Sequence, residues 1–219
     1  EVYGKNFDEL YIGYEKAGRY KKQMSAQTLW TMIIDAQVET GTPYLLYKDA
    51  CNAKSNQKNL GTIKSSNLCT EIIEYSSKNE YAVCNLASIS LRHHIINGSF
   101  DFVELERTAS LLTRVVNRMI DVNQYPTKET KQNLKHRPIG IGIQGLADVF
   151  AILELPFTCP EAKTLNRDIA ECIYFSTLKE SNLMAREEGT YESFQGSPAS
   201  RGILQFDMWR EENRHPVVM

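Results

Sequence analysis

The sequence lacks several features that define common classes of protein. No run of about 18 apolar residues occurs, so no membrane-spanning helix is expected. The five cysteines include no CxxC pair, and the four histidines are not spaced near them as zinc ligands would be. A formal net charge of -2 argues against a nucleic-acid-binding surface. The odd cysteine count favours a reducing compartment, the cytoplasm, over a disulfide framework.

What is present fits an ordinary folded protein. The 219 residues are 42% hydrophobic and 24% charged, which is typical of globular chains and unlike disordered ones. The sequence starts at Glu1 rather than at a methionine, and no signal peptide is recognisable. We therefore expect residues 1–219 to be a fragment of one domain of a longer protein.

Helical and strand-like segments alternate along the chain. The clearest helix is 102–121, whose apolar residues fall on one stripe and whose N-cap is Asp101. Further helices are predicted at 24–39, 146–153 and 161–188, and strands at 44–47, 62–74, 81–90 and 137–144. This alternation predicts an α/β fold. A complete barrel needs more strands, so a barrel would be partial here.

The segment Asn67-Leu68-Cys69-Thr70-Glu71 holds the most informative chemistry. In an extended strand or narrow hairpin, alternate side chains share a face, so Asn67, Cys69 and Glu71 would point the same way. An amide, a thiol and a carboxylate could together bind a hydroxylated substrate, abstract from it and move a proton. The alternative is a partly buried strand with a structural cysteine.

Cys84 lies in the short apolar run of the predicted strand 81–90. If 62–74 and 81–90 formed a hairpin, Cys84 could approach the same site. The alternative is inert packing, which is the usual role of a buried cysteine.

Gly140, Gly142 and Gly145 fit the dinucleotide-binding pattern GxGxxG. That pattern should follow a strand, whereas these glycines lie within the predicted strand 137–144. We therefore expect them to allow a backbone or ligand to approach closely. A nicotinamide-dependent enzyme using these glycines stays as a less favoured alternative.

Several long motifs together resemble the class I ribonucleotide reductase large subunit in its eukaryotic form. They are SNQKNLGTI at 55–63, SNLCTEI at 66–72, AVCNLAS at 82–88, RPIGIGIQGLAD at 137–148, GSP at 196–198 and GILQFDMW at 202–209. Their order and spread from Tyr3 to Trp209 make the resemblance more specific than any single motif. Residues 210–219 have no clear match.

The resemblance implies a fold and a function. The family fold is a ten-stranded α/β barrel with the reactive cysteine on a finger loop inside it, and the family reduces ribonucleoside diphosphates to deoxyribonucleotides. By position, Cys69 matches the thiyl-radical cysteine and Glu71 the carboxylate that accepts the 3′-hydroxyl proton. Asn67 matches the amide that binds substrate hydroxyls, with Leu68 and Thr70 in the same substrate-binding segment. Cys84 matches one member of the redox pair.

The resemblance also implies what lies elsewhere. The redox partner of Cys84 is expected upstream of Glu1, since Cys51, Cys159 and Cys172 do not match it. The phosphate-binding segment and radical-relay tyrosines are expected downstream of Met219, so the fragment alone should be inactive. Implied partners are a metal-containing small subunit that supplies the radical and a second large subunit. ATP and dATP are expected to bind outside this chain, and no metal or cofactor within it. The alternative is a non-catalytic α/β interaction module.

Overall fold

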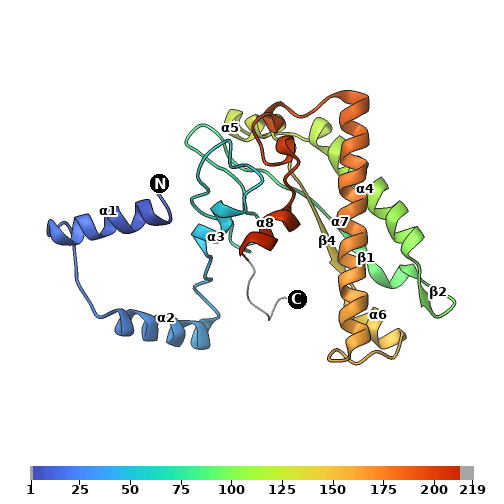
Figure 1. Ribbon diagram of the computed structural model, residues 1–219, viewed down its shortest axis with the longest axis horizontal. Coiled ribbons are helices and arrows are strands. Elements are labelled where there is room, and N and C mark those ends of the chain that lie inside the picture. The colour runs from blue at the N-terminus through green and yellow to red at the C-terminus, as the bar shows by residue number, and fades with distance from the viewer. Residues whose placement is uncertain (1, 213–219) are drawn as a thin grey trace. The chain divides into compact units, whose positions relative to one another are not determined.

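The computed structural model describes residues 2–212, with side chains up to residue 209, and the chain divides into two compact units (Figure 1). The first unit comprises Glu1–Ser77 with Gln195–Met219, and the second comprises Lys78–Phe194. Within the described part of the chain, no helix has both the length and the apolar character needed to cross a membrane. Residues 213–219, most of the segment that the motifs leave unmatched, lie outside the described residues.

The first unit is built from short helices and irregular segments. Its helices are α1 (Lys5–Lys16), α2 (Ala26–Thr40), α3 (Lys48–Ala53), the short η4 (Ala199–Arg201) and α8 (Gln205–Glu212). Helix α2 confirms the predicted helix 24–39 and ends at Thr40. Its C-cap is Gly41, whose φ of 76° is left-handed and whose amide donates to the Gln37 carbonyl at 2.9 Å.

The second unit contains a strand–helix–strand arrangement. Strand β1 (Asn85–Ser90) pairs in parallel with β4 (Ile139–Gln144), and the register places Leu86 opposite Gly140 and Ser88 opposite Gly142. Between them lie η1 (Leu91–His94), the hairpin β2 (Ile95–Ile96) and β3 (Ser99–Phe100), α4 (Phe102–Val122), α5 (Lys128–Lys131) and η2 (Gln132–Lys135). After β4 come α6 (Leu146–Ile152), α7 (Pro160–Glu188) and η3 (Glu192–Phe194).

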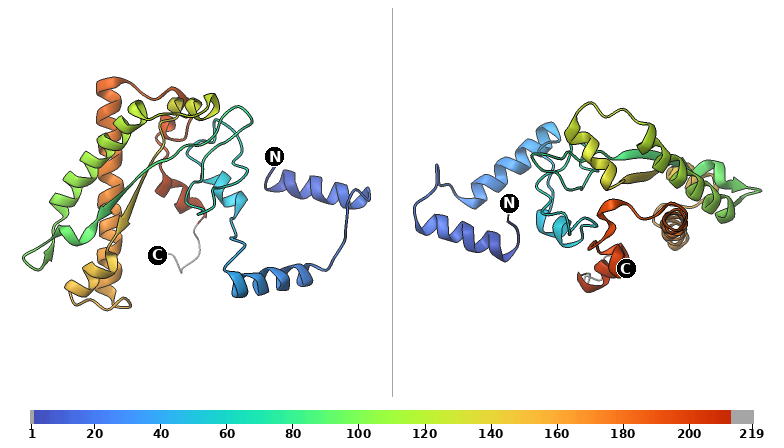
Figure 2. Two further views of the ribbon diagram at one scale, coloured as in Figure 1. Left: turned by 180° about the vertical axis from the view of Figure 1, so that it is seen from behind. Right: turned by 90° about the horizontal axis from the view of Figure 1, so that it is seen from above.

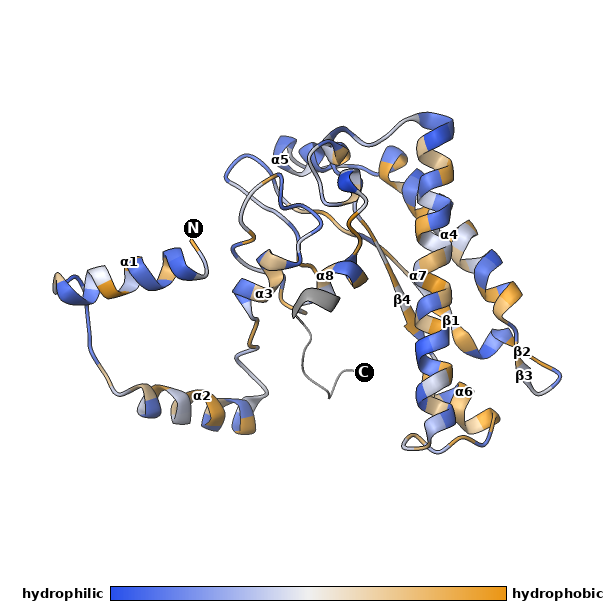
Figure 3. Cartoon of the chain, in the orientation of Figure 1, coloured by the Kyte–Doolittle hydropathy of each residue, from blue (hydrophilic) through white to orange (hydrophobic). Residues whose placement is uncertain are grey.

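Apolar side chains of the strands and helices form one core in the second unit. Ile89 of β1, Leu105 of α4 and Ile169 of α7 are almost completely buried in one cluster. Figure 2 shows α4 and α7 running beside each other, and Figure 3 shows the hydrophobic colour over much of both paired strands. At the surface, Arg114 of α4 donates to the Glu187 carboxylate of α7 at 2.9 Å.

These elements confirm the α/β class and the predicted helices 102–121, 146–153 and 161–188. The Asp101 carboxylate caps α4 as expected, accepting the Glu104 amide at 3.0 Å. Among the described residues, the only parallel strand pair is β1–β4, so the barrel is partial as predicted.

Two predicted strands are wrong, and the hairpin that 62–74 and 81–90 could have formed is absent from the described residues. Residues 44–47 and 62–74 form no strand, and β1 pairs with β4 rather than with 62–74. Residues 62–74 form no strand because side-chain amides, and not a neighbouring strand, bind their backbone.

Candidate functional site

The predicted reactive segment forms a tight loop, which we call the Cys69 loop (residues 66–72). Leu68 to Thr70 form its turn, and the Thr70 amide donates to the Asn67 carbonyl at 3.2 Å. Thr70 has a φ of 67°, which is unusual for a β-branched residue and marks a local constraint. Cys69 is exposed in this turn. A reactive thiol needs such access to a substrate.

The Asn67 side chain closes the loop. Its Oδ1 accepts the Ile72 amide at 3.1 Å, and its Nδ2 donates to Oε1 of Glu71 at 2.8 Å. The Ser66 hydroxyl adds a bond of 2.6 Å to the Ile72 carbonyl. The amide and the carboxylate on either side of Cys69 are therefore close together, as predicted. A turn rather than an extended strand brings them together.

Two further amide side chains bind the backbone on either side of the loop, and sequence reasoning assigned them no role. Asn52 is buried and binds both backbone groups of Ile63, accepting its amide at 2.7 Å and donating to its carbonyl at 2.9 Å. Gln57 accepts the Tyr75 amide at 2.7 Å. The signal in the sequence was the run of amide side chains between Cys51 and Leu60.

The segment after η4 also supports this region of the first unit. The Gln205 amide donates to the Lys54 carbonyl at 2.7 Å and to Oδ1 of Asn56 at 2.6 Å. Asn59 similarly donates to the Gln195 carbonyl at 3.1 Å. Motifs far apart in the sequence therefore meet within the first unit.

In the second unit, the half-buried Cys84 directly precedes β1 and lies against β4. A Cβ atom built on Gly140 would be 3.1 Å from the Cys84 sulfur and 2.5 Å from Cδ2 of Leu86. The glycine therefore allows a close approach, as predicted for this motif.

Arg137 fixes the start of β4. Its guanidinium binds both oxygens of Asp121, at 2.6 and 2.9 Å, and both the side-chain and backbone oxygens of Asn117. The bidentate bond lowers the pKa of the Asp121 carboxyl and raises that of Arg137. Sequence reasoning placed Arg137 only in a motif and did not identify this anchor.

Two other cysteines of the second unit, Cys159 and Cys172, lie in or beside helix α7. The Cys159 sulfur accepts the Ala162 amide at the start of α7, at 3.3 Å. Burial raises the pKa of the Cys172 thiol, which disfavours the reactive thiolate.

The glycine pattern GxGxxG does not have the geometry of a dinucleotide site. Gly140 and Gly142 lie inside β4, and Gly145 precedes α6 with a φ of 80°. In a dinucleotide site, the glycines form the loop after the strand. The nicotinamide alternative therefore gains no support. Within the described residues, no group of three or more His, Cys, Asp or Glu side chains could hold a metal ion.

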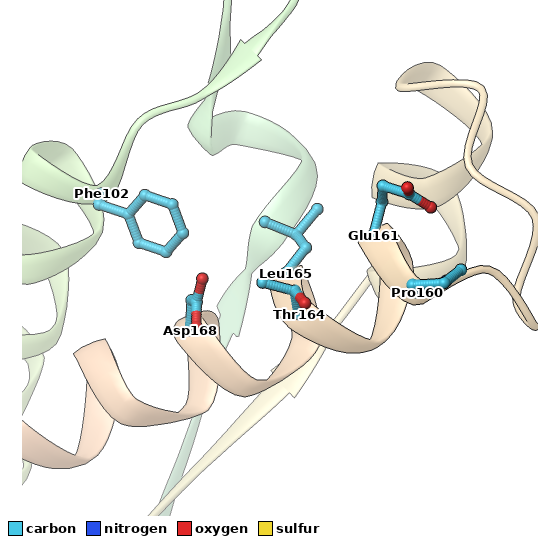
Figure 4. A pocket seen from close by; sticks show the side chains of 6 residues that line it. All are labelled: Phe102, Pro160, Glu161, Thr164, Leu165 and Asp168. Atoms are coloured by element: carbon cyan, nitrogen blue, oxygen red, sulfur yellow. The ribbon is translucent and has the colours of Figure 1, made fainter.

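A pocket of about 380 Å³ opens between the start of α4 and the first turns of α7 (Figure 4). It is lined by Phe102, Pro160, Glu161, Thr164, Leu165 and Asp168. None of the predicted site residues lines it, and it offers no thiol. The candidate site residues are therefore those of the Cys69 loop in the first unit and, described separately, Cys84 in the second unit.

Comparisons with known proteins show the family of the chain. The family model described as "Ribonucleotide reductase, barrel domain" matches residues 1–217. The chain is 57% identical over 215 residues to the ribonucleoside-diphosphate reductase large subunit of Trypanosoma brucei brucei, covering 98% of this chain and 26% of that protein. It is 54% identical over 210 residues to the ribonucleoside-diphosphate reductase large chain of Schizosaccharomyces pombe, covering 95% of this chain and 26% of that protein.

A solved structure shows the same similarity. The class Id ribonucleotide reductase alpha subunit of Actinobacillus ureae superposes with a TM-score of 0.68 at 28% identity, covering 78% of this chain and 34% of that chain. The chain spans about a quarter of the length of the curated relatives it matches, for example 26% of the Trypanosoma brucei brucei large subunit.

Proposed function

The chain belongs to the ribonucleotide reductase barrel-domain family, and we propose that it is part of the catalytic large subunit of a ribonucleoside-diphosphate reductase. The proposed reaction converts a ribonucleoside diphosphate and two thiols into a deoxyribonucleoside diphosphate, one disulfide and water. The observation that supports it best is the Cys69 loop, in which the exposed Cys69 lies in sequence between Asn67 and Glu71, whose side chains hydrogen-bond each other at 2.8 Å.

We assign each loop residue a step. Cys69, as a thiyl radical, takes the 3′ hydrogen atom of the ribose and becomes a thiol. Glu71 accepts the proton of the 3′-hydroxyl, which assists loss of the 2′-hydroxyl as water. Asn67 binds a substrate hydroxyl and holds Glu71 in place. Leu68 and Thr70 complete the substrate-binding turn.

Cys84 supplies reducing equivalents together with a second cysteine outside this chain. Two thiols provide two electrons and two protons as they form one disulfide, which balances the reduction of the ribose and the release of water. The Cys69 radical is regenerated and does not enter this balance.

The rest of the proposal concerns the whole protein. The radical originates in a metal-containing small subunit that binds the large subunit, which itself forms a dimer in the cytoplasm. ATP and dATP regulate the enzyme at a site outside the 219 residues, and this chain binds no metal itself.

Cys69→Ser in the full-length protein tests the central assignment. Because Cys69 is exposed, serine should leave folding and substrate binding unchanged while turnover is lost. Cys159→Ser is the matched control, since serine is a good N-cap and should preserve the bond to the Ala162 amide. Retained deoxynucleotide formation by Cys69→Ser, or an equal loss in both variants, would overturn the assignment.

A further inference from the structure

Gly140 occupies a position in β4 where the backbone does not require glycine. Its φ lies outside the left-handed range that marks Gly41 or Gly145, so any L-residue could adopt this conformation. Glycine weakens a strand interior because it has no side chain to pack and loses more entropy on folding. Glycine is therefore favoured at position 140 for a reason other than backbone geometry.

The surroundings of Gly140 supply that reason. The nearest atoms to a Cβ built there are Cδ2 of Leu86 at 2.5 Å and the Cys84 sulfur at 3.1 Å. Gly142, two residues along the same strand, differs sharply. A Cβ there would be 3.6 Å from the Ser88 hydroxyl, an ordinary contact.

The two neighbours of Gly140 differ in their ability to move. The Leu86 side chain is 53% exposed, so it can rotate towards solvent. Cys84 is half-buried, and its sulfur is attached directly to Cβ, so its position depends on a single torsion. A methyl group at position 140 would thus displace Leu86 easily but would restrict the torsional freedom of the Cys84 sulfur.

We propose that Gly140 is a positioning residue that keeps open the space in which the Cys84 sulfur rotates when it forms and breaks its disulfide. This inference depends on the proposed function of Cys84. A disulfide demands an S–S distance near 2.05 Å and a dihedral near 90°, so the sulfur must be free to reach a defined position. In the balanced step, the Cys84 thiol and a second thiol of the parent protein lose two electrons and two protons to the ribonucleotide.

The test compares Gly140→Ala and Gly142→Ala in the full-length enzyme with its small subunit and a dithiol reductant. Gly140→Ala should lower kcat roughly tenfold or more and leave KM for the nucleoside diphosphate within about twofold, because the thiol step and not substrate binding is impaired. Gly142→Ala should stay within about twofold of the parent in both constants.

A second readout does not depend on turnover. The rate at which iodoacetamide alkylates Cys84, followed by mass spectrometry of its peptide, should fall in Gly140→Ala and not in Gly142→Ala. Equal kcat and equal alkylation rates in the two alanine variants would overturn the inference. Full activity of Cys84→Ser would instead overturn the proposed redox role of Cys84.

The double variant Leu86→Ala with Gly140→Ala separates the two contacts. It removes the closer clash at Leu86, so the protein should fold even if Gly140→Ala alone does not, while the methyl group near the sulfur remains. We expect the double variant to keep the low kcat and slow alkylation. Recovery of both in the double variant would show that strand packing, rather than the freedom of the sulfur, explains the glycine.

Discussion

Replacing Glu71 with glutamine separates the chemical role of this side chain from its structural role. Oε1 of Glu71 accepts a bond of 2.8 Å from Nδ2 of Asn67. Glutamine has a carbonyl oxygen at the same distance from the backbone, so the loop can keep this bond. The variant loses only the negative charge and the ability to accept a proton.

The expected magnitudes decide which loss dominates. A general base contributes about 10²–10⁴ in rate, which corresponds to about 3–5 kcal/mol in the activation barrier. Glu71 and Asn67 are both exposed, so changing a charged bond into a neutral one should weaken the loop by less than about 1 kcal/mol. The loss of the base should therefore lower kcat of Glu71→Gln by about 100-fold or more, with an unchanged melting temperature.

The assay is deoxynucleoside diphosphate formation by the full-length protein and its small subunit at saturating substrate. Glu71→Asp is the control, because it keeps the carboxylate but withdraws it by about 1.5 Å, one carbon–carbon bond. Its kcat should lie between those of the parent and the glutamine variant. If Glu71→Gln kept more than about a tenth of the parental kcat, the carboxylate would have only a structural role in the loop.

Three further predictions concern the stability of the second unit. Leu105→Ala should lower the free energy of unfolding by about 2–5 kcal/mol in urea denaturation, whereas Leu111→Ala, at a site 57% exposed on the same helix, should change it by less than about 0.5 kcal/mol; equal effects would contradict the assigned core. Asp101→Ala removes the N-cap of α4 and should cost about 1 kcal/mol in the same assay, and no change would show that the cap is dispensable. Arg137 lowers the pKa of the Asp121 carboxyl below its ordinary 3.8. The bond between them should therefore contribute its full stabilisation above pH 3.8. This stabilisation should be lost as the pH falls through the lower pKa of the folded state. The stability difference between the parent and Asp121→Asn should therefore shrink below about pH 4, and a difference independent of pH would refute this.

The sequence predicted the helices well because their signals are local. The apolar stripe of 102–121 and its cap at Asp101 need no distant partner to be recognised, and α4 agrees with both. Helix α1 was not predicted from the sequence. The strand predicted at 62–74 was wrong because the side-chain amides of Asn52 and Asn67, which are near in sequence, bind its backbone in place of a neighbouring strand.

The candidate site was predicted partly for a wrong reason. Asn67 and Glu71 do lie together, but a turn through Thr70 achieves what alternation along a strand was expected to do. The glycine motif was correctly expected to allow a close approach. Its partner, the sulfur of Cys84, could not be identified before the register of β1 and β4 was known. The roles of Cys69 and Cys84 in turnover stay predictions.

The alternation of isoleucine and glycine along β4 also determines how this strand can pair. In the observed register, Gly140 and Gly142 face Leu86 and Ser88 across the ladder. A slip of one residue would bring an isoleucine opposite Leu86. The difference in side-chain volume between isoleucine and glycine therefore disfavours pairing of β1 and β4 in a register shifted by one residue. A misaligned chain would lose both the fit at Leu86 and the close approach of the strand to the Cys84 sulfur in the same event.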